Sequence, residues 1–229
     1  MKLSVIIPVY NEKNYILAVL KKVNKQKDKF DIEIIVTDDG SIDGTVDIIK
    51  DNKHLYDKAI FNEKNDGKGS AIKECLNHVT GDYVLIQDAD LEYNPDEYKN
   101  LIAPILDYNA EIVFGSRFKG GQPERVLYFK NRVANFVLSL IVSILTNINF
   151  SDVETGYKLI KTSKLKLLDL KEKSFGIEIE IVMKLAKTNS SFYEVGISYH
   201  GRTYEEGKKI RFSDGIVALY KIFYYKFFN

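Results

Sequence analysis

The chain has 229 residues, of which 45% are hydrophobic and 28% charged. This composition is ordinary for a soluble globular protein, and the length allows one large domain or two small ones. A net charge of +1 provides no general attraction to nucleic acid, so no nucleic-acid partner is expected. The single cysteine, Cys75, excludes an internal disulfide and a cysteine zinc site. The absence of a signal-peptide pattern after Met1 predicts a cytoplasmic location.

The first half of the chain alternates short apolar runs with amphipathic stretches. Strands are predicted at residues 3–9, 33–36, 58–61, 83–86 and 112–114, and helices at 15–23, 45–49, 70–79 and 95–106. This alternation predicts an α/β fold with a mostly parallel, doubly wound sheet. Ligands bind beyond the carboxyl ends of the strands in such sheets, and polar clusters fall there at 8–12, 38–45, 88–92 and 115–117. The alternation stops after about residue 120.

An acidic loop follows the fourth predicted strand and contains Asp88-Ala89-Asp90, with Glu92 two residues further on. Alternate positions after a strand can aim two carboxylates at one point. Carboxylates are hard ligands for Mg²⁺ or Mn²⁺, and such an ion usually shares its coordination with substrate phosphates. The competing interpretation is a solvated loop that caps a helix near Pro95. The pattern is short and common, and alone it leaves both interpretations open.

Two more loops have possible binding roles. Residues 38–45 superficially resemble an EF-hand, but the twelfth position is Lys50 and no helix precedes the loop, which excludes a calcium site. This loop is either a turn with an N-cap at Asp43 or Thr45, or a site in which Asp39 binds a ribose or base. The glycine-containing segment 66–70 matches neither a phosphate loop nor a dinucleotide fingerprint, and is either a plain turn or a helix start near the ligand.

Five blocks, taken in order, resemble the family 2 glycosyltransferases with the GT-A fold. They are residues 5–12 (VIIPVYNE), 38–45 (DDGSIDGT), 88–92 (DADLE), 115–117 (GSR) and 201–210 (GRTYEEGKKI). The chain looks most like the dolichol-phosphate mannosyltransferase group, which loads a hexose onto a polyprenyl phosphate. The resemblance runs from Leu3 to about Ile216. It implies a single GT-A (Rossmann-like) domain of residues 1–229, with a nucleotide-sugar-binding half (1–120) and an acceptor and membrane-interface half (121–229) that ends in amphipathic helices.

The resemblance also implies roles for particular residues. The nucleotide pocket would be lined by Pro8, Tyr10, Glu12, Thr37 and Asp39, with Asp88 and Ala89 contacting nucleotide and sugar. A Mg²⁺ or Mn²⁺ ion would be surrounded by Asp88, Asp90 and Glu92, and phosphates would be met by Arg117, Arg202 and Lys208. Asp90, Arg117 and Arg202 would be the catalytic residues. The best-known relatives carry glutamine in place of Glu92, and its extra negative charge can change the metal preference.

The implied reaction moves mannose or glucose from a GDP- or UDP-hexose to a polyprenyl phosphate lipid, with inversion at the anomeric carbon. A divalent ion stabilises the departing diphosphate as a Lewis acid, and arginine binds two phosphate oxygens at once. A hydroxyl acceptor needs a general base, whereas a phosphate is mostly dianionic at pH 7 and does not. Candidate bases, which can instead be caps or supporting partners, are Asp152, Glu154, Glu178 and Glu180.

Two apolar segments in the second half indicate contact with a membrane surface. Residues 133–151 carry no charge, and Asn135, Ser139, Ser143 and Asn147 form a polar stripe at helical spacing. This helix is predicted to lie in the membrane interface or, alternatively, to pack on the core or on a dimer partner. The last ten residues hold six aromatics with Lys221 and Lys226, a composition that suits the headgroup region, although core packing of part of this helix competes. We therefore expect a peripheral enzyme on the cytoplasmic face of a membrane, with a homodimer or a membrane-protein partner as further options.

Three rival functions are distinguishable. The first is the same fold acting on a soluble or cell-envelope glycan acceptor. The second is a non-enzymatic nucleotide-sugar-binding protein, against which the intact acidic and basic blocks argue. The third is a sugar nucleotidyltransferase, which would open with a glycine-rich, arginine-bearing loop after the first strand. Residues 8–12 contain neither residue type.

Overall fold

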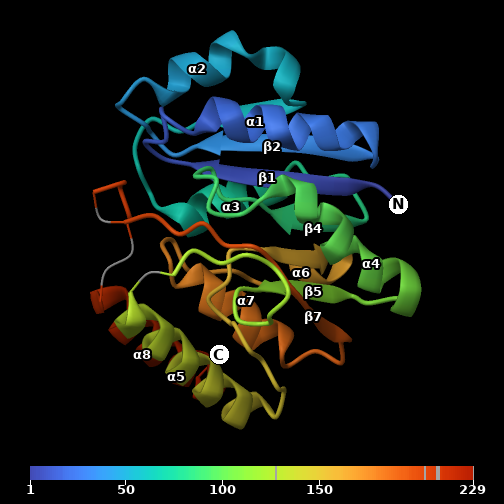
Figure 1. Cartoon of the computed structure of the whole chain (residues 1–229), viewed down its shortest axis with the longest axis vertical. Coiled ribbons are helices and arrows are strands. Elements are labelled where there is room, and N and C mark those ends of the chain that lie inside the picture. The colour runs from blue at the N-terminus through green and yellow to red at the C-terminus, as the bar shows by residue number, and fades with distance from the viewer. Residues whose placement is uncertain (127, 204, 210–211, 229) are drawn as a thin grey trace.

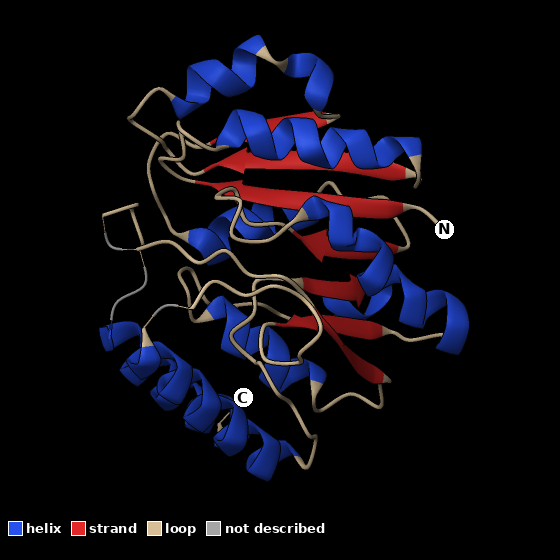
Figure 2. Cartoon of the chain, in the orientation of Figure 1, coloured by secondary structure: helices blue, strands red, loops and turns tan. Residues whose placement is uncertain are grey.

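A seven-stranded sheet forms the centre of the computed structural model, which describes residues 1–126, 128–203, 205–209 and 212–228. The strands are β1 (Leu3–Val9), β2 (Ile32–Asp38), β3 (Lys58–Phe61), β4 (Tyr83–Ile86), β5 (Ile112–Ser116), β6 (Lys158–Lys161) and β7 (Phe192–Gly196). Their order is β3-β2-β1-β4-β6-β5-β7, and only β6 runs antiparallel to its neighbours. The predicted α/β fold with a mostly parallel sheet is confirmed (Figures 1 and 2).

Helices cover both faces of the sheet, because the central strands are apolar on both sides. The helices are α1 (Ile16–Lys25), α2 (Thr45–Asp51), α3 (Lys68–Leu76), α4 (Tyr98–Tyr108), α5 (Phe129–Thr146), α6 (Thr162–Lys166), α7 (Ile177–Leu185) and α8 (Phe212–Phe227), with short 3₁₀ turns at Gln26–Asp28, Lys53–Leu55 and Pro95–Glu97. Val5 and Ile7 of β1 share a core with α1, α2 and α4, whereas Ile6 faces α3, α5, α7 and α8. The alternation of side chains along one strand therefore supplies two separate cores.

The second half of the chain completes the same sheet as the first. The antiparallel strand β6 lies between β4 and β5, and β7 extends the sheet beyond β5. Neither strand was predicted from the sequence. The strands β1, β3 and β4 have the predicted bounds, and the remaining predicted elements lie within a few residues of theirs.

Helices α5 and α8 pack side by side at one end of the molecule (Figure 1). The polar stripe predicted for α5 is turned toward the protein: Ser139 accepts a hydrogen bond from the amide of Val153 at 3.2 Å, and Ser143 accepts one from Phe150 at 3.0 Å. Leu138 and Val142 are buried beside these serines, and the apolar side chains on the opposite side of α5 are left at the surface. They form a stripe at helical spacing, made of Phe129, Val133, Phe136, Val137, Leu140 and Ile144.

A matching exposed stripe runs along α8 and the residue that follows it, and consists of Ile216, Val217, Tyr220, Phe223, Phe227 and Phe228. The opposite side of α8 belongs to the core, where Ile222 and Tyr225 are fully buried and the Tyr225 hydroxyl donates to Glu172 at 2.7 Å. The aromatic C-terminal segment thus serves both as core and as exposed surface. We call the two exposed stripes together the apolar face.

Candidate active site

The acidic loop after β4 lies at the edge of the sheet where the parallel strands end (Figures 1 and 2). Leu91 adopts a positive φ of 61°, which turns the backbone sharply and lets the Glu92 amide donate to Asp90 Oδ1 at 3.1 Å. A non-glycine residue in this conformation is strained, and such strain is common at functional sites. Asp90 and Glu92 are thereby held close together beside the end of β1.

Arg202 lies at the centre of this acidic group. Its guanidinium contacts Asp90 Oδ2 at 2.8 Å, the two Glu12 oxygens at 3.1 and 3.2 Å, and Glu92 Oε1 at 3.4 Å. Its backbone amide also donates to Glu92 Oε1 at 2.9 Å. The residues predicted separately to bind phosphate, nucleotide and metal thus contact one another in this structure.

The segment that carries Arg202 also contains Lys209, which anchors it to the protein at a second point. Its ammonium contacts Glu12 Oε1 and the Tyr10 carbonyl oxygen, both at 2.5 Å. A cavity of about 190 Å³ lies beside this contact and is lined in part by Glu12, Tyr15, Asp43, Arg202 and Lys209. The segment containing Arg202 and Lys209 therefore crosses the carboxyl ends of β1 and β4.

The cluster of Glu12, Asp90 and Glu92 carries more negative charge than Arg202 and Lys209 neutralise. Burial raises the pKa of Asp90 to about 7, and the charges of Glu92, Asp88 and Glu12 raise it further, while Arg202 only partly opposes them. Burial disfavours the charged form of a carboxyl, and neighbouring negative charges disfavour it further. A divalent cation would relieve this excess.

Asp88, the first aspartate of the loop, belongs to a second network that extends under the site. Lys68 Nζ bridges Asp88 Oδ1 at 2.6 Å and Glu178 Oε1 at 2.9 Å, and Glu178 also binds Lys158 at 2.5 Å. Burial alone would lower the pKa of Lys68, but Asp88 and Glu178 raise it well above its usual value. Burial likewise opposes ionisation of Glu178, yet Lys158 and Lys68 lower its pKa to about 2. Two acids and two lysines balance in charge, so this buried network stays ionised.

The glycines beside Lys68 place its ammonium in this network. A Cβ atom at Gly67 or Gly69 would collide with the backbone of Glu172 and Lys173, so only glycine allows this close approach. The segment 66–70 therefore contains the start of helix α3, next to Asp88, and is not a plain turn. Sequence reasoning noted the glycines but missed Lys68, because its partner Glu178 lies far along the chain.

Arg117, at the end of β5, forms a bidentate ion pair with Asp152, with both nitrogen–oxygen distances at 2.7 Å. Its guanidinium also lies 5.1 Å from the centre of the Tyr199 ring, and the Tyr199 hydroxyl donates to Glu92 Oε2 at 2.7 Å. Burial opposes the charge, but Asp152 raises the pKa of Arg117 well above its usual value. Arg117 therefore belongs to the same edge of the sheet as the acidic loop.

The other predicted pocket residues lie deeper or at the margin. Pro8 and Thr37 are register partners in β1 and β2 and are buried, with the Thr37 hydroxyl 3.0 Å from Cys75 Sγ. Ala89 is also buried. Asp39 accepts hydrogen bonds from Asn62 and from the amides of Asp66 and Gly67, and so shapes the loop leading to Lys68. Lys208 is half-buried, with its ammonium 5.1 Å from the centre of the Tyr128 ring.

The predicted metal set of Asp88, Asp90 and Glu92 stays a prediction. Within the described ranges, no group of three or more acidic, histidine or cysteine side chains is arranged to hold a metal ion. Both Glu92 oxygens accept hydrogen bonds, from Tyr199 and from Arg202, which makes Glu92 a partner of those residues. Asp88 and Asp90 remain suitable, since Mg²⁺ in nucleotide sites is typically bound by one or two carboxylates together with substrate phosphates.

The sheet, with an acidic loop at the carboxyl ends of its strands and a basic segment folded over it, has the arrangement expected above for a GT-A glycosyltransferase. The chain belongs to the glycosyl transferase family 2, whose family description matches residues 4–168. It is 31% identical over 222 residues to an uncharacterised protein of Methanocaldococcus jannaschii, covering 90% of this chain and 93% of that protein. It is 28% identical over 215 residues to the dolichol-phosphate mannosyltransferase of Pyrococcus furiosus, covering 92% of this chain but only 61% of that enzyme.

Solved structures confirm the fold. Glucosyl-3-phosphoglycerate synthase from Mycobacterium tuberculosis, in complex with Mn²⁺, uridine diphosphate and phosphoglyceric acid, superposes with a TM-score of 0.78. The alignment covers 100% of this chain and 79% of that one at 19% identity. A second structure of that synthase, with Mg²⁺ and uridine diphosphate, gives a TM-score of 0.74 at 19% identity, covering 98% of this chain and 79% of that one. At this identity the likeness concerns the fold.

Proposed function

We propose that the protein is a metal-dependent inverting glycosyltransferase that moves mannose or glucose from a nucleotide-diphosphate sugar to a polyprenyl phosphate. The observation that carries the proposal is the meeting of Asp90, Glu12 and Arg202 at the carboxyl edge of the sheet. Carboxylates recruit a divalent ion and arginine binds phosphate oxygens, so one site holds groups for both partners of a phosphate-linked transfer. The similarity to the dolichol-phosphate mannosyltransferase supports the lipid acceptor.

The donor is expected at the acidic loop. Asp88 and Asp90 would hold Mg²⁺ or Mn²⁺, and such an ion supplies charge stabilisation to the departing diphosphate. The Mn²⁺ and Mg²⁺ complexes of the structural relative support this cofactor, and its uridine diphosphate supports a nucleotide-sugar donor. Both GDP- and UDP-hexoses are to be tested. Arg202 would leave the carboxylates and turn to phosphate oxygens, which offer it the same bidentate geometry.

The acceptor is expected at a membrane surface on the cytoplasmic side. The apolar face exposes twelve large side chains on two neighbouring helices, and Lys130 and Arg132 lie at the start of α5. Exposed apolar groups bordered by basic residues suit an interface with anionic lipid. Within the described part of the chain, α5 is also the one helix long and apolar enough to cross a membrane, a property that alone does not decide the matter. Its inward polar stripe and its packing against α8 favour a helix that lies along the surface.

Membrane binding is tested by substitutions that spare the core. Deleting the C-terminal segment would remove the buried Ile222 and Tyr225, so we choose exposed positions instead. The double variant Phe136→Ser/Phe227→Ser is expected to bind liposomes with anionic lipid at least 10-fold more weakly, because each phenyl group contributes about 1.5–3 kcal/mol when buried. Leu106→Ser on α4, where the side chain is 67% exposed, is the matched control. Equal binding by both variants and the wild type would exclude the apolar face as the contact.

Transfer is tested with polyprenyl phosphate in detergent and with a soluble or cell-envelope glycan, using GDP- and UDP-hexoses with Mn²⁺. We expect a lipid-linked product. Efficient transfer to the glycan and none to the lipid phosphate would replace this proposal with the glycan-acceptor alternative. The molar mass of the protein in solution, measured without liposomes, shows whether the apolar face instead joins two copies of the chain.

A further inference from the structure

One of the four candidate acidic residues is left without a partner. Asp152 is occupied by Arg117, Glu178 by Lys158 and Lys68, and Glu180 by the amides of Lys171 and Glu172 at 2.7 Å each. In contrast, Glu154 Oε1 is buried and has no hydrogen-bond partner among the described residues. A buried polar atom without a partner is costly, and a catalytic or ligand-binding role is one reason for which a protein retains it.

The chain segment that holds Glu154 passes directly against the acidic loop. Gly156 lies so close to the Asp88 carboxylate that a Cβ atom there would collide with it. The Gly156 amide donates to the Tyr93 hydroxyl at 2.8 Å. Glu154, two residues earlier, lies within electrostatic reach of Lys158 and Glu178 of the buried network and of the Arg117–Asp152 pair at the end of β5.

The charges facing Glu154 do not neutralise it. Burial raises the pKa of Glu154 to about 7, Glu178 and Asp152 raise it, and Lys158 and Arg117 lower it. Those two cations are already paired with Glu178 and Asp152. A carboxyl in this setting favours its neutral form, and a neutral carboxyl donates a hydrogen bond, which a carboxylate cannot do. An approaching phosphate dianion would favour the neutral form further.

We propose that the neutral carboxyl of Glu154 donates a hydrogen bond to the acceptor phosphate and so selects a phosphate over a hydroxyl acceptor. This inference rests on the proposed polyprenyl phosphate acceptor. In the reaction, an acceptor phosphate oxygen forms the bond to the anomeric carbon. The bond between that carbon and the donor phosphate oxygen breaks, and its electron pair leaves with the nucleoside diphosphate. Glu154 keeps its proton throughout, whereas a hydroxyl acceptor would require Glu154 to take a proton.

Replacing Glu154 with glutamine distinguishes a hydrogen-bond donor from a general base, because glutamine donates a hydrogen bond but cannot take up a proton. Glu154→Gln is expected to keep kcat with polyprenyl phosphate within about 3-fold at pH 7 and to lose the decline in rate above pH 7. Glu154→Ala is expected to raise the KM for the lipid phosphate about 10-fold, the loss of one hydrogen bond to a charged group. Donor binding by calorimetry is expected to stay unchanged in both. The exposed Glu63→Gln is the matched control.

Thermal unfolding of each variant shows that it is folded before kinetics are compared. A folded Glu154→Gln that binds donor normally but loses kcat 100-fold or more would identify Glu154 as a base and overturn the inference. An Ala variant with unchanged KM would overturn it as well. Failure of the wild type to use lipid phosphate, combined with transfer to a glycan, would instead refute the proposed function on which the inference rests.

Discussion

Replacing Arg202 with methionine tests whether the acidic group needs a cation. The Arg202 side chain is about 10% exposed and contacts three carboxylates. The Coulomb attraction between two unit charges 4 Å apart is about 4 kcal/mol at an effective dielectric constant of 20, before the cost of desolvation is subtracted. Removing one partner of a buried ion pair costs about 3–5 kcal/mol of stability. In the variant Glu12 keeps its ion pair with Lys209, which limits the loss. Allowing for partial access of solvent, we expect Arg202→Met to lower the free energy of unfolding by about 3 kcal/mol at pH 8.

The loss should depend on pH and on metal. Asp90 already has a pKa raised to about 7, and losing Arg202 removes the main charge that lowers it. A raised carboxyl pKa favours the folded state at low pH and weakens it as pH rises through that pKa, so the loss should shrink at pH 5. Mn²⁺ should raise the unfolding midpoint more in the variant than in the wild type.

The assay is urea unfolding at pH 5 and pH 8, with EDTA or Mn²⁺. Arg125→Met is the control, because Arg125 pairs with Glu206 at 2.7 Å at the surface and its loss should change stability little. Equal effects of the two substitutions, or a loss at pH 8 that neither acid nor Mn²⁺ reduces, would refute the reasoning.

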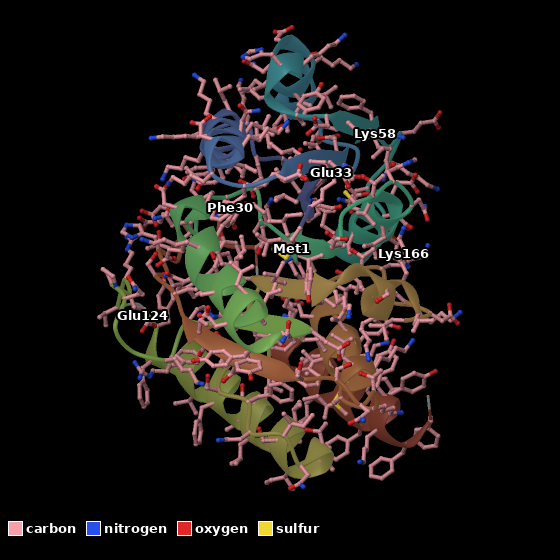
Figure 3. All side chains as sticks on the ribbon, turned by 90° about the vertical axis from the view of Figure 1, so that its right-hand side faces the viewer. Met1, Phe30, Glu33, Lys58, Glu124 and Lys166 are labelled. Atoms are coloured by element: carbon pink, nitrogen blue, oxygen red, sulfur yellow. The ribbon has the colours of Figure 1, made fainter. Side chains whose placement is uncertain are left out.

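Three further predictions concern the metal, the stereochemistry and a remote carboxylate. Asp90→Ala should abolish Mn²⁺-dependent donor binding measured by calorimetry, and unchanged affinity would rule out this metal site. NMR of the product from an α-linked donor should show a β linkage, since retention is incompatible with a single displacement. Glu33, at the opposite edge of the sheet near Met1 (Figure 3), has a pKa of about 2, because hydrogen bonds from Ser4 and Thr80 outweigh the effect of burial. The ionised Glu33 stabilises the fold above pH 4.5, and this stabilisation is lost as the pH falls toward 2. Between these pH values the free energy of unfolding of Glu33→Gln should therefore fall by about 1–2 kcal/mol less than that of the wild type. An identical acid profile for both proteins would contradict this.

The first half of the fold was predictable because its strands are continuous apolar runs. The run from Leu3 to Val9 is buried at every position, and strand β4 from Tyr83 to Ile86 is too. The two late strands lack this signal. Strand β6 begins with Lys158, a fully buried cation held by Glu178 and by the Thr155 carbonyl oxygen, and β7 is half-buried throughout. Local patterns do not reveal a buried ion pair whose members are distant in sequence.

The site was predictable as a set of residues but not as an arrangement. The acidic loop and Arg202 were predicted from motifs, yet their direct contact depends on how the segment after β7 folds back over β1 and β4. The role of Lys68 was missed for the same reason. Glu154 was named among four candidate bases, but nothing in the sequence separates it from the other three, because the difference arises from the surrounding side chains. Glu92 illustrates the converse: its position in the motif suggests a metal ligand, while its neighbours Tyr199 and Arg202 use both of its oxygens.

The insertion of β6 between β4 and β5 has a consequence for how the chain acquires its structure during synthesis. Strand β5 leaves the ribosome before β6, yet in the finished sheet it does not pair with β4, and its pairing partners among the described strands are β6 and β7. At a synthesis rate of about 5–20 residues per second, the apolar residues of β5 stay unpaired for a time on the order of seconds. A fragment ending near residue 120 would carry β5 as an unpaired, aggregation-prone edge. The first half is therefore expected to be a poor autonomous folding unit, because β5 becomes paired once β6 and β7 have been synthesised.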